Sequence, residues 1–359
     1  MSVARLRIGI IGANPERGWA RDAHLPALRA LDGFVIQAVS ARTQAIANAA
    51  KASFGAVSAY ADSLALARDP DVDIVSVCVK VPEHRAVVLA ALAAGKHVYC
   101  EWPLGRDTAE AEEMAAAAKA AGVHVAIGLQ GANAIGVRHA GQLVQDGAIG
   151  DPQSLNMISP TAGWSRVMPE VYAYLQDRSN GATLLSIAGG HSLAAIEQVV
   201  GAFTEITAIG SALVPLVEIS GTGKTIKRTG FDHLVIVGRH ANGCVSTLEV
   251  VGGTSSVPFS FALRGSAGIL TIAGGHAGGF QVGPLTVSTE PPSAPQAPLV
   301  ALSVEGPALN LSAMYARLGD DIRDGTWTVP DFAAAVHFHR LLDAIDTSAS
   351  EGRCVRLDD

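Results

Sequence analysis

The chain lacks the features that mark membrane, nucleic-acid-binding and disulfide-rich proteins. Its 359 residues carry a formal net charge of −7 and no basic block, so we expect no nucleic-acid partner. No apolar run reaches the about 18 residues that a membrane-spanning helix needs, and the first residues lead directly into a strand, so neither a membrane partner nor a signal segment is expected. The four cysteines are widely spaced without a C-x-x-C pair, which predicts free thiols and a cytoplasmic location.

Metal and hydrolase motifs are also missing. The eleven histidines form no H-x-x-x-H or H-E-x-x-H arrangement, and the chain has no G-x-S-x-G elbow. His337 and His339 lie two residues apart in a helical pattern and therefore point away from each other. The sequence thus predicts neither a metal site nor an activated serine.

Strands and helices alternate through the first 128 residues. Continuous apolar strands are expected at residues 6–11, 35–40, 74–79, 97–100 and 123–127. Helices are expected between them at residues 43–54, 83–94 and 107–121, with Thr43 and Asp107 as N-cap residues. Strands without polar alternation, separated by helices, indicate a parallel sheet covered on both faces, so residues 1–128 are expected to form an α/β domain of Rossmann type.

The pattern changes after residue 128. Helices at residues 135–145 and 192–200 are expected among β-rich runs at residues 154–158, 206–213, 233–238, 244–251, 259–263 and 269–272. These runs predict an α+β domain at residues 129–330 with a largely antiparallel sheet, in which Asn242-Gly243 turns a hairpin. Residues 274–307, rich in Gly, Pro and Ser, are expected to form a long surface excursion. A last helix is expected at residues 331–345, and residues 331–359 are expected to pack back on the first domain.

The loop after the first strand carries a candidate dinucleotide site. Gly12, Ala13, Gly18 and Trp19 lie in it, and glycines there let the backbone turn tightly and approach a pyrophosphate before the next helix begins. The loop is longer than G-x-G-x-x-G, and an ordinary glycine-rich turn is the alternative. The ordered strand–helix pattern that follows favours the cofactor site.

The end of the second strand bears on the choice of cofactor. An NAD site usually places an acid there for the ribose 2′-hydroxyl, whereas this chain has Ser40, Arg42 and Thr43. These residues offer donors and a fixed positive charge for a 2′-phosphate, so NADP(H) is predicted in preference to NAD(H). The alternative is that Thr43 caps a helix and Arg42 is a solvated surface residue.

At this point the chain resembles the glucose–fructose oxidoreductase/inositol dehydrogenase (Gfo/Idh/MocA) family. The resemblance rests on residues 8–12, 24–28, 71–79, 82, 84, 95–98 and 101–104. The longer glycine loop, the turn at residues 80–84 and a tryptophan at position 102 resemble the subgroup that includes the fungal galactose-regulon co-repressor. That co-repressor has the oxidoreductase fold and binds a dinucleotide, but acts by binding a transcription activator.

The resemblance implies roles for a turn and two loops of the first domain. It places Glu101 beside the nicotinamide ribose and Pro103 in a turn that is often cis, and it places Trp102 where the family has a lysine that does proton chemistry. An indole offers one non-titrating N–H and a flat apolar face, so Trp102 would shape the pocket; packing alone is the alternative. Pro82 is also expected at the cofactor site, and His24 and His84, which lie in matching loop positions, could line the cofactor cleft. For each histidine, a helix-start residue is an equally plausible alternative.

Two side chains are candidates for proton or charge chemistry. His191 fits the histidine of the family's second-domain motif, while Ser186 lies near the position of its aspartate. A histidine near its ordinary pKa can exchange a proton with a hydroxyl, although a structural or helix-capping histidine is the alternative. Lys80 follows the third expected strand, at the sheet edge where ligands bind, and could replace the missing ammonium or neutralise phosphate; an exposed loop lysine is the alternative.

Together these features predict an NADP(H)-dependent oxidoreductase. The resemblance implies hydride transfer between the nicotinamide and a carbinol or carbonyl of a sugar or related small molecule, with His191, Trp102 and Lys80 as the catalytic set. It also implies a homo-oligomer. A non-catalytic dinucleotide-binding regulator similar to the co-repressor is the alternative, favoured by the loss of the family lysine and aspartate.

Overall fold

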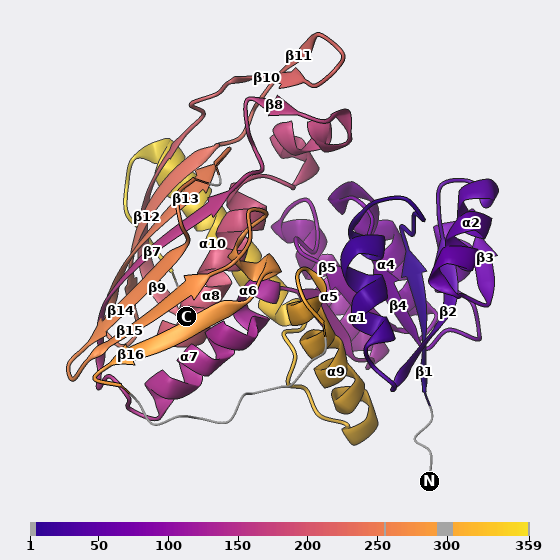
Figure 1. The fold of residues 1–359 in the computed structure, drawn as a ribbon, viewed down its shortest axis with the longest axis horizontal. Helices are drawn as coiled ribbons and strands as arrows, with labels where there is room; N and C mark the ends of the chain where they lie inside the picture. Colours follow the sequence, from indigo (N-terminus) through magenta and orange to yellow (C-terminus); the bar gives the residue numbers. More distant parts are fainter. Residues whose placement is uncertain (1–4, 255, 293–303, 358–359) are drawn as a thin grey trace. The chain divides into compact units, whose positions relative to one another are not determined.

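The computed structural model describes residues 5–254, 256–292 and 304–357. They form two compact units, each built from two stretches of chain (Figure 1). The first unit comprises Met1–Gly128 and Leu302–His337, and the second comprises Leu129–Ala301 and Phe338–Asp359. The expected limits of independently folding domains stay a prediction.

The first unit is built on a parallel sheet with the strand order β3-β2-β1-β4-β5-β6. Its strands are β1 (Leu6–Ile11), β2 (Phe34–Ser40), β3 (Ser58–Tyr60), β4 (Ile74–Val77), β5 (His97–Glu101) and β6 (Val125–Gly128). Its helices are η1 (Ala20–His24), α1 (Leu25–Arg29), α2 (Gln44–Phe54), α3 (Ser63–Ala67), η2 (Val81–Glu83), α4 (His84–Ala93), α5 (Thr108–Ala121) and α9 (Ala308–Asp324). The predicted α/β fold class is confirmed.

The central strands of the sheet, β1 and β4, are buried along most or all of their length, as is typical of a parallel sheet covered on both faces. Ile8 and Ile10 of β1 pack into a core with helices α1 and α9. Gly9, between them, faces the other side, where an added Cβ would meet Leu66 of α3 at 2.7 Å. The polar caps follow the sequence signals: Thr43 accepts from the Ile46 amide and Asp107 from the Glu110 amide.

Helix α9 was not expected from the sequence. It lies more than 170 residues beyond β6 in the chain, yet Leu311, Met314, Tyr315 and Leu318 present one apolar stripe to the core of the first unit. Its neighbours in that core include α1 and η1. The first unit is therefore completed by a segment from the C-terminal part of the chain.

The second unit contains a larger sheet with the strand order β16-β15-β14-β7-β13-β12-β9-β17. The strands of this sheet are β7 (Pro152–Thr161), β9 (Phe203–Ser211), β12 (His233–His240), β13 (Val245–Gly252), β14 (Ser260–Gly265), β15 (Ile269–Gly274), β16 (Leu285–Glu290) and β17 (Val355–Arg356). All its pairings are antiparallel except β7 with β13, so the predicted largely antiparallel sheet is confirmed. The hairpin at Asn242-Gly243 joins β12 to β13 as expected.

Smaller elements complete the second unit. A separate sheet has the order β11-β10-β8, from β8 (Val167–Met168), β10 (Leu216–Ile219) and β11 (Lys224–Lys227). The helical segments are α6 (Gln130–Asn133), α7 (Ile135–Gln145), η3 (Glu170–Gln176), η4 (Arg178–Asn180), η5 (Leu185–Gly189), α8 (Gly190–Val200) and η6 (Phe280–Val282). Helix α10 (Phe332–Glu351) contributes to both units, which meet in sequence at His337 and Phe338.

Two expectations for the C-terminal third differ from the structure. Residues 274–307 were expected to form a surface excursion, but β16 within them pairs antiparallel with β15; residues 293–303 of that range lie outside the described residues. Residues 331–359 were expected on the first domain: the residues up to His337 do belong to the first unit, whereas the later ones belong to the second, where β17 pairs with β9. Strand β17 has only two residues and pairs with a strand far earlier in the chain, so no local pattern indicates its pairing, whereas β16 pairs with the strand that directly precedes it.

Candidate functional site

The glycine loop lies at the carboxyl edge of the parallel sheet. Gly12 follows β1 with a φ of +94°, and a Cβ on it would lie 2.6 Å from the carbonyl oxygen of Cys78, which follows β4. The amides of Gly12 and Ala13 donate to the carbonyl oxygen of Ser40 at the end of β2. Backbone from three neighbouring strands therefore meets here without intervening side chains, which fixes the tight turn at the start of the loop.

The remainder of the loop leads into the first helical segment. Asn14 accepts from the amides of Glu16 and Arg17, and Gly18, with a φ of +99°, accepts from the amides at the start of η1. Trp19 is half-buried, and its indole Nε1 is buried without a hydrogen-bond partner among the described residues. The loop thus has a fixed shape and one donor that the described protein atoms leave unused.

The three residues at the end of β2 have different surroundings. Ser40 is fully buried and its hydroxyl lies 3.1 Å from that of Ser63, so it faces the protein interior. The Thr43 side chain caps α2, which is the helix-capping role given above as the alternative to cofactor binding. Arg42 is exposed and has no ion-pair or hydrogen-bond partner among the described residues. Of the three, the Arg42 guanidinium is the group best placed to meet an external phosphate.

The turns after β4 and β5 are tied together by His84. Its Nδ1 lies 3.0 Å from the Pro103 carbonyl oxygen and its Nε2 lies 3.0 Å from the Val79 carbonyl oxygen, and the ring is almost fully buried. Burial lowers the pKa of His84, against the raising effect of these carbonyls. His84 therefore connects the turn after β4 to the turn after β5 through buried hydrogen bonds. Lys80 and Pro82, in the turn after β4, are exposed.

Strand β5 delivers the Glu101-Trp102-Pro103 turn. The Trp102–Pro103 peptide bond is cis, as the resemblance implied. Trp102 is 5% exposed, so its indole is largely enclosed. Glu101 remains partly exposed and its Oε1 lies 2.9 Å from Nε2 of His24. The carboxylate therefore has one oxygen committed to an internal partner.

The second unit holds the remaining candidates. His191, in the first turn of α8, is buried, and its Nδ1 accepts from the Gly131 amide at 3.3 Å. Gly131 passes so close that a Cβ there would lie 2.3 Å from the His191 carbonyl oxygen. Ser186 accepts from the Thr183 amide and donates to the Gly181 carbonyl oxygen, so its hydroxyl caps a helical turn rather than replacing a carboxylate.

A buried cluster in the same unit was missed from the sequence. Arg228 forms an ion pair with Asp232, and both are almost fully buried. The guanidinium also donates to the carbonyl oxygen of Trp164 and to Oε1 of Gln176. Trp164 has a φ of +59°, an uncommon backbone conformation for a bulky residue that this clamp helps to hold. An Arg and an Asp four residues apart carry no motif, so nothing local signalled the cluster.

The structure brings together the candidates of the first unit. Register pairs Ile11 with Ser40 and Val77, and Val77 with Cys100, so the residues that follow β1, β2, β4 and β5 share one sheet edge.

Among the described residues, no helix combines the length and apolar composition needed to cross a membrane. Nor does the described part of the chain group three or more His, Cys, Asp or Glu side chains as a metal site would.

Two family models match the chain, one over each half. The model of the oxidoreductase family with an NAD-binding Rossmann fold matches residues 6–129, and the model of the Gal80p C-terminal domain matches residues 136–274. The chain belongs to the Gfo/Idh/MocA oxidoreductase family. Its second half places it with the Gal80-like members, as the turn and loop features of the first half predicted.

Individual relatives include both enzymes and regulators. Dehydrogenase aclE of Aspergillus oryzae is 29% identical over 98% of either chain. The galactose/lactose metabolism regulatory protein GAL80 of Saccharomyces cerevisiae is 27% identical over 76% of this chain and 68% of its own; a super-repressor mutant of it superposes with a TM-score of 0.88, at 22% identity over 98% of each chain. Levoglucosan dehydrogenase in complex with NADH and levoglucosan superposes with a TM-score of 0.82, at 21% identity over 99% of this chain and all of the other.

The Gfo/Idh/MocA assignment supports a nicotinamide dinucleotide as the class of cofactor. The chain thus has the dinucleotide-binding fold of an oxidoreductase family whose members here include dehydrogenases and the Gal80 regulators. The glycine loop fits such a group by its position, because it follows β1 at the carboxyl edge of a parallel sheet and leads into a helical segment. The preference for NADP(H) and the roles of the single residues stay predictions.

Proposed function

We propose that this protein is an NADP(H)-dependent oxidoreductase acting on a carbinol or carbonyl of a sugar-like or related small molecule. The observation that carries the proposal is the exposed Arg42, which has no partner among the described residues and follows β2 at the carboxyl edge of the sheet, the edge at which the glycine loop also begins. When bound, the nicotinamide supplies or accepts the hydride. The identity to Dehydrogenase aclE over nearly the full length supports the same class of reaction.

In this proposal, the following residues of the first unit bind the cofactor. Amides of the Gly12–Gly18 loop bind the pyrophosphate, Arg42 and Thr43 bind the 2′-phosphate, and Glu101 accepts from ribose hydroxyls. Lys80 adds positive charge near the phosphates, and Trp102 excludes water with a non-titrating ring.

His191 has the proton role in this proposal. The Gly131 amide donates to Nδ1, so the neutral ring carries its proton on Nε2. An Nε2–H donor suits a substrate oxygen that becomes negative as a carbonyl is reduced, and the same nitrogen would hold the proton in the reverse direction.

The decisive experiment is turnover. Purified protein is incubated with NADPH and a panel of keto-sugars and other carbonyl compounds, and NADPH absorbance is followed. Oxidation of NADPH that is abolished in His191→Ala and retained in the matched variant His139→Ala supports the enzyme. Loss of turnover in both variants, or in neither, would contradict the assigned role of His191.

A regulatory function is the second candidate, favoured by two observations. Trp102 stands where the family has its proton-transferring lysine, and the second half matches the domain of Gal80p, a regulatory protein. Tight binding of NADPH without turnover on every panel member would support a dinucleotide-binding regulator.

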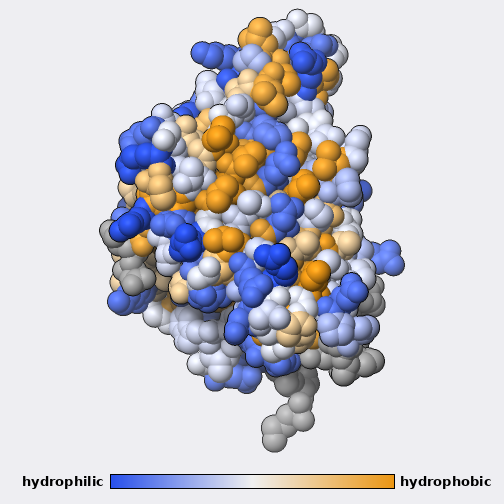
Figure 2. All heavy atoms as spheres, turned by 90° about the vertical axis from the view of Figure 1, so that its left-hand side faces the viewer, coloured by the Kyte–Doolittle hydropathy of each residue, from blue (hydrophilic) through white to orange (hydrophobic). Residues whose placement is uncertain are grey.

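We further propose that the protein is a cytoplasmic homo-oligomer. All four cysteines are free thiols, as expected in a reducing compartment. Apolar atoms lie among polar ones on the exposed face of the larger sheet (Figure 2), and Ile209, Val237 and Val245 of this sheet are 70%, 47% and 42% exposed. An open apolar sheet face of this kind suits a second copy of the chain.

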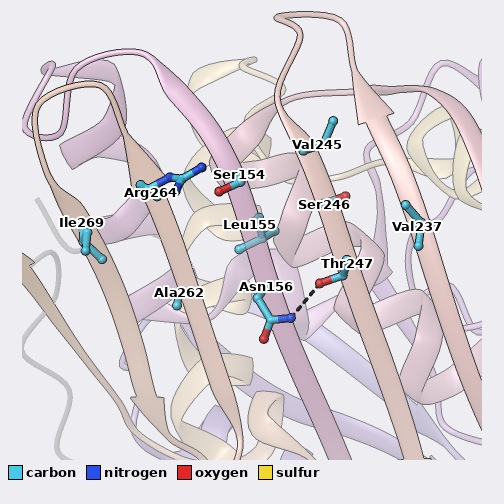
Figure 3. Close-up of a pocket in the computed structure, with 10 residues that line it drawn as sticks. All are labelled: Ser154, Leu155, Asn156, Val237, Val245, Ser246, Thr247, Ala262, Arg264 and Ile269. Atoms are coloured by element: carbon cyan, nitrogen blue, oxygen red, sulfur yellow. Dashed lines mark hydrogen bonds between the residues drawn. The ribbon is translucent and has the colours of Figure 1, made fainter.

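The exposed face of the larger sheet is shallow enough to contact a second sheet. A shallow hollow of about 400 Å³ runs across five strands, and Asn156 donates to Thr247 at 2.7 Å within it (Figure 3). Arg264 is the charged residue among those that line the hollow, so a sheet of a second copy could cover the rest of the lining without burying a charge. Val237→Asp should shift the molar mass from light scattering towards the monomer, whereas Val57→Asp, at an exposed valine of the first unit, should leave it unchanged.

A further inference from the structure

The start of the glycine loop uses its backbone amides inside the protein. The amides of Gly12 and Ala13 both donate to the carbonyl oxygen of Ser40, at 3.1 and 2.9 Å. Each backbone amide is a single donor, so an amide with an internal acceptor is already used. The two residues that directly follow β1 therefore offer no amide to a phosphate.

The middle of the loop is committed in the same way. The amides of Glu16 and Arg17 donate to Oδ1 of Asn14, at 2.9 and 3.2 Å, and Pro15 has no amide hydrogen. Within the described part of the chain, the loop amides without an acceptor are those of Asn14 and Gly18. The loop therefore keeps two backbone donors for a ligand, fewer than its length suggests.

This shortage of amides bears on how a dinucleotide can be held. In the usual glycine loop, backbone amides are the donors that surround the diphosphate, and they do so without a cationic side chain. A doubly charged diphosphate needs more donors than two amides provide. At this loop the remaining donors must come from side chains.

Arg17 is the cationic residue of the loop between Gly12 and Gly18. Its side chain is exposed, and it has no ion-pair or hydrogen-bond partner among the described residues. Arg21, one helical turn later, differs because its guanidinium forms an ion pair with Asp22 at 2.6 Å. Arg17 is therefore the guanidinium of this segment that no described carboxylate occupies.

We propose that Arg17 binds the diphosphate of the cofactor, so that its guanidinium supplies hydrogen bonds that amides supply in the usual glycine loop. The proposal rests on the proposed function, since it needs a dinucleotide at this sheet edge. A guanidinium suits this task because its planar set of donors matches two phosphate oxygens at once. The phosphates are thereby divided between two arginines: Arg17 binds the diphosphate that NADPH and NADH share, and Arg42 binds the 2′-phosphate of NADPH.

The test uses two ligands that each carry one of these phosphate groups. ADP has the diphosphate without a 2′-phosphate, and adenosine 2′-monophosphate has the 2′-phosphate without a diphosphate. Calorimetric dissociation constants for both, and for NADPH and NADH, are measured with the wild type, Arg17→Ala and Arg42→Ala. Arg17→Ala should weaken the binding of ADP, NADPH and NADH about tenfold each, as expected for one lost charge-assisted hydrogen bond. It should leave adenosine 2′-monophosphate unchanged, whereas Arg42→Ala should weaken that ligand and leave ADP unchanged.

Three further variants separate this role from a general effect of charge or of the fold. Arg21→Ala removes an exposed arginine that Asp22 already holds, so ADP affinity should stay as in the wild type. Glu16→Gln removes the exposed carboxylate beside Arg17, which repels phosphate, and should strengthen ADP binding about twofold. Arg17→Lys keeps the charge but not the paired donors and should bind ADP more tightly than Arg17→Ala.

Urea unfolding completes the test, because Arg17→Ala removes no contact among the described residues and should have the wild-type midpoint. A lower midpoint would assign the loss of affinity to the fold and overturn the proposal. Unchanged ADP affinity in Arg17→Ala, or a loss confined to NADPH and adenosine 2′-monophosphate, would also overturn it while leaving the proposed function intact. Absence of binding of both NADPH and NADH to the wild type would instead overturn the proposed function, and the role of Arg17 with it.

Discussion

Gly12 and Cys78 approach each other so closely that no side chain fits between them. A Cβ on Gly12 would lie 2.6 Å from the Cys78 carbonyl oxygen, and the φ of +94° is itself unfavourable for any residue with a Cβ. Because the Cys78 atom is backbone, it cannot rotate away. The first strand–loop turn is therefore restricted to glycine for two independent reasons.

Gly12→Ala should accordingly lower both stability and cofactor binding. The left-handed backbone and the clash together predict a loss of about 2–4 kcal/mol in the free energy of unfolding, with NADPH binding abolished. Gly55→Ala is the matched control, since Gly55 is also left-handed but an added Cβ would meet nothing within 4 Å. It should cost about 1 kcal/mol and leave binding intact. Urea unfolding and calorimetry measure the two effects, and similar losses in both variants would contradict the close-approach argument.

Arg42→Ala tests the cofactor preference. An exposed guanidinium without a protein partner is available to a 2′-phosphate, and a charge-assisted hydrogen bond of this kind contributes about 1.5–3 kcal/mol. NADPH affinity should therefore fall by roughly 10- to 100-fold while NADH affinity changes little. Arg68→Ala, at another exposed arginine of the first unit, should affect neither. Equal losses for the two cofactors in Arg42→Ala would refute the NADP(H) assignment.

The part of the site that could be predicted from the sequence is the part with local signals. The β1–glycine loop, the Thr43 cap and the Glu101-Trp102-Pro103 turn each lie within a few residues of the strand that delivers them, so pattern alone located them. Tyr315 stands 291 residues from its partner His24, and helix α9, which brings it there, has no motif. The Arg228–Asp232 ion pair was missed for the same reason, because the two side chains are buried by segments from elsewhere in the second unit.

Asp232→Ala should destabilise the second unit strongly. Removing the carboxylate leaves the Arg228 charge buried without its counterion and frees the amides of Leu213 and Val214, which both donate to Asp232. Loss of one partner of a buried pair costs about 3–5 kcal/mol. Glu113→Ala breaks the exposed pair with Arg85 and should cost about 0–1 kcal/mol. The measurement is the urea midpoint of unfolding, and equal midpoints for the two variants would show that the Arg228 clamp does not stabilise the unit.

His240 should make the stability of the second unit depend on pH. Burial lowers the pKa of this histidine, although the Gly201 carbonyl and Glu197 oppose the shift, and the neutral ring donates from Nδ1 to Gly201 and accepts at Nε2 from Ser246. Because the folded pKa lies below the unfolded value of about 6.5, this stabilisation is complete above that pH and is lost as the pH falls towards the folded pKa. His240→Asn keeps a donor but does not titrate. The stability gap between wild type and His240→Asn should narrow from pH 7 to pH 5; a constant gap would exclude the linkage.

Trp102→Lys distinguishes the enzyme from the regulator at the position where the chain departs from its family. An ammonium there can give or take a proton, which the indole cannot, and a positioned proton donor contributes about 10²–10⁴-fold to a rate. If Trp102 adjoins the nicotinamide, the lysine variant should raise the rate of NADPH oxidation on at least one carbonyl compound, or create turnover where the wild type has none. Trp102 is 5% exposed, so some stability is lost in any such variant, and Trp102→Leu controls for that loss without adding a titrating group. A lysine variant that matches the leucine variant in both cofactor affinity and rate would mean that Trp102 packs the turn and does not adjoin the reacting ring.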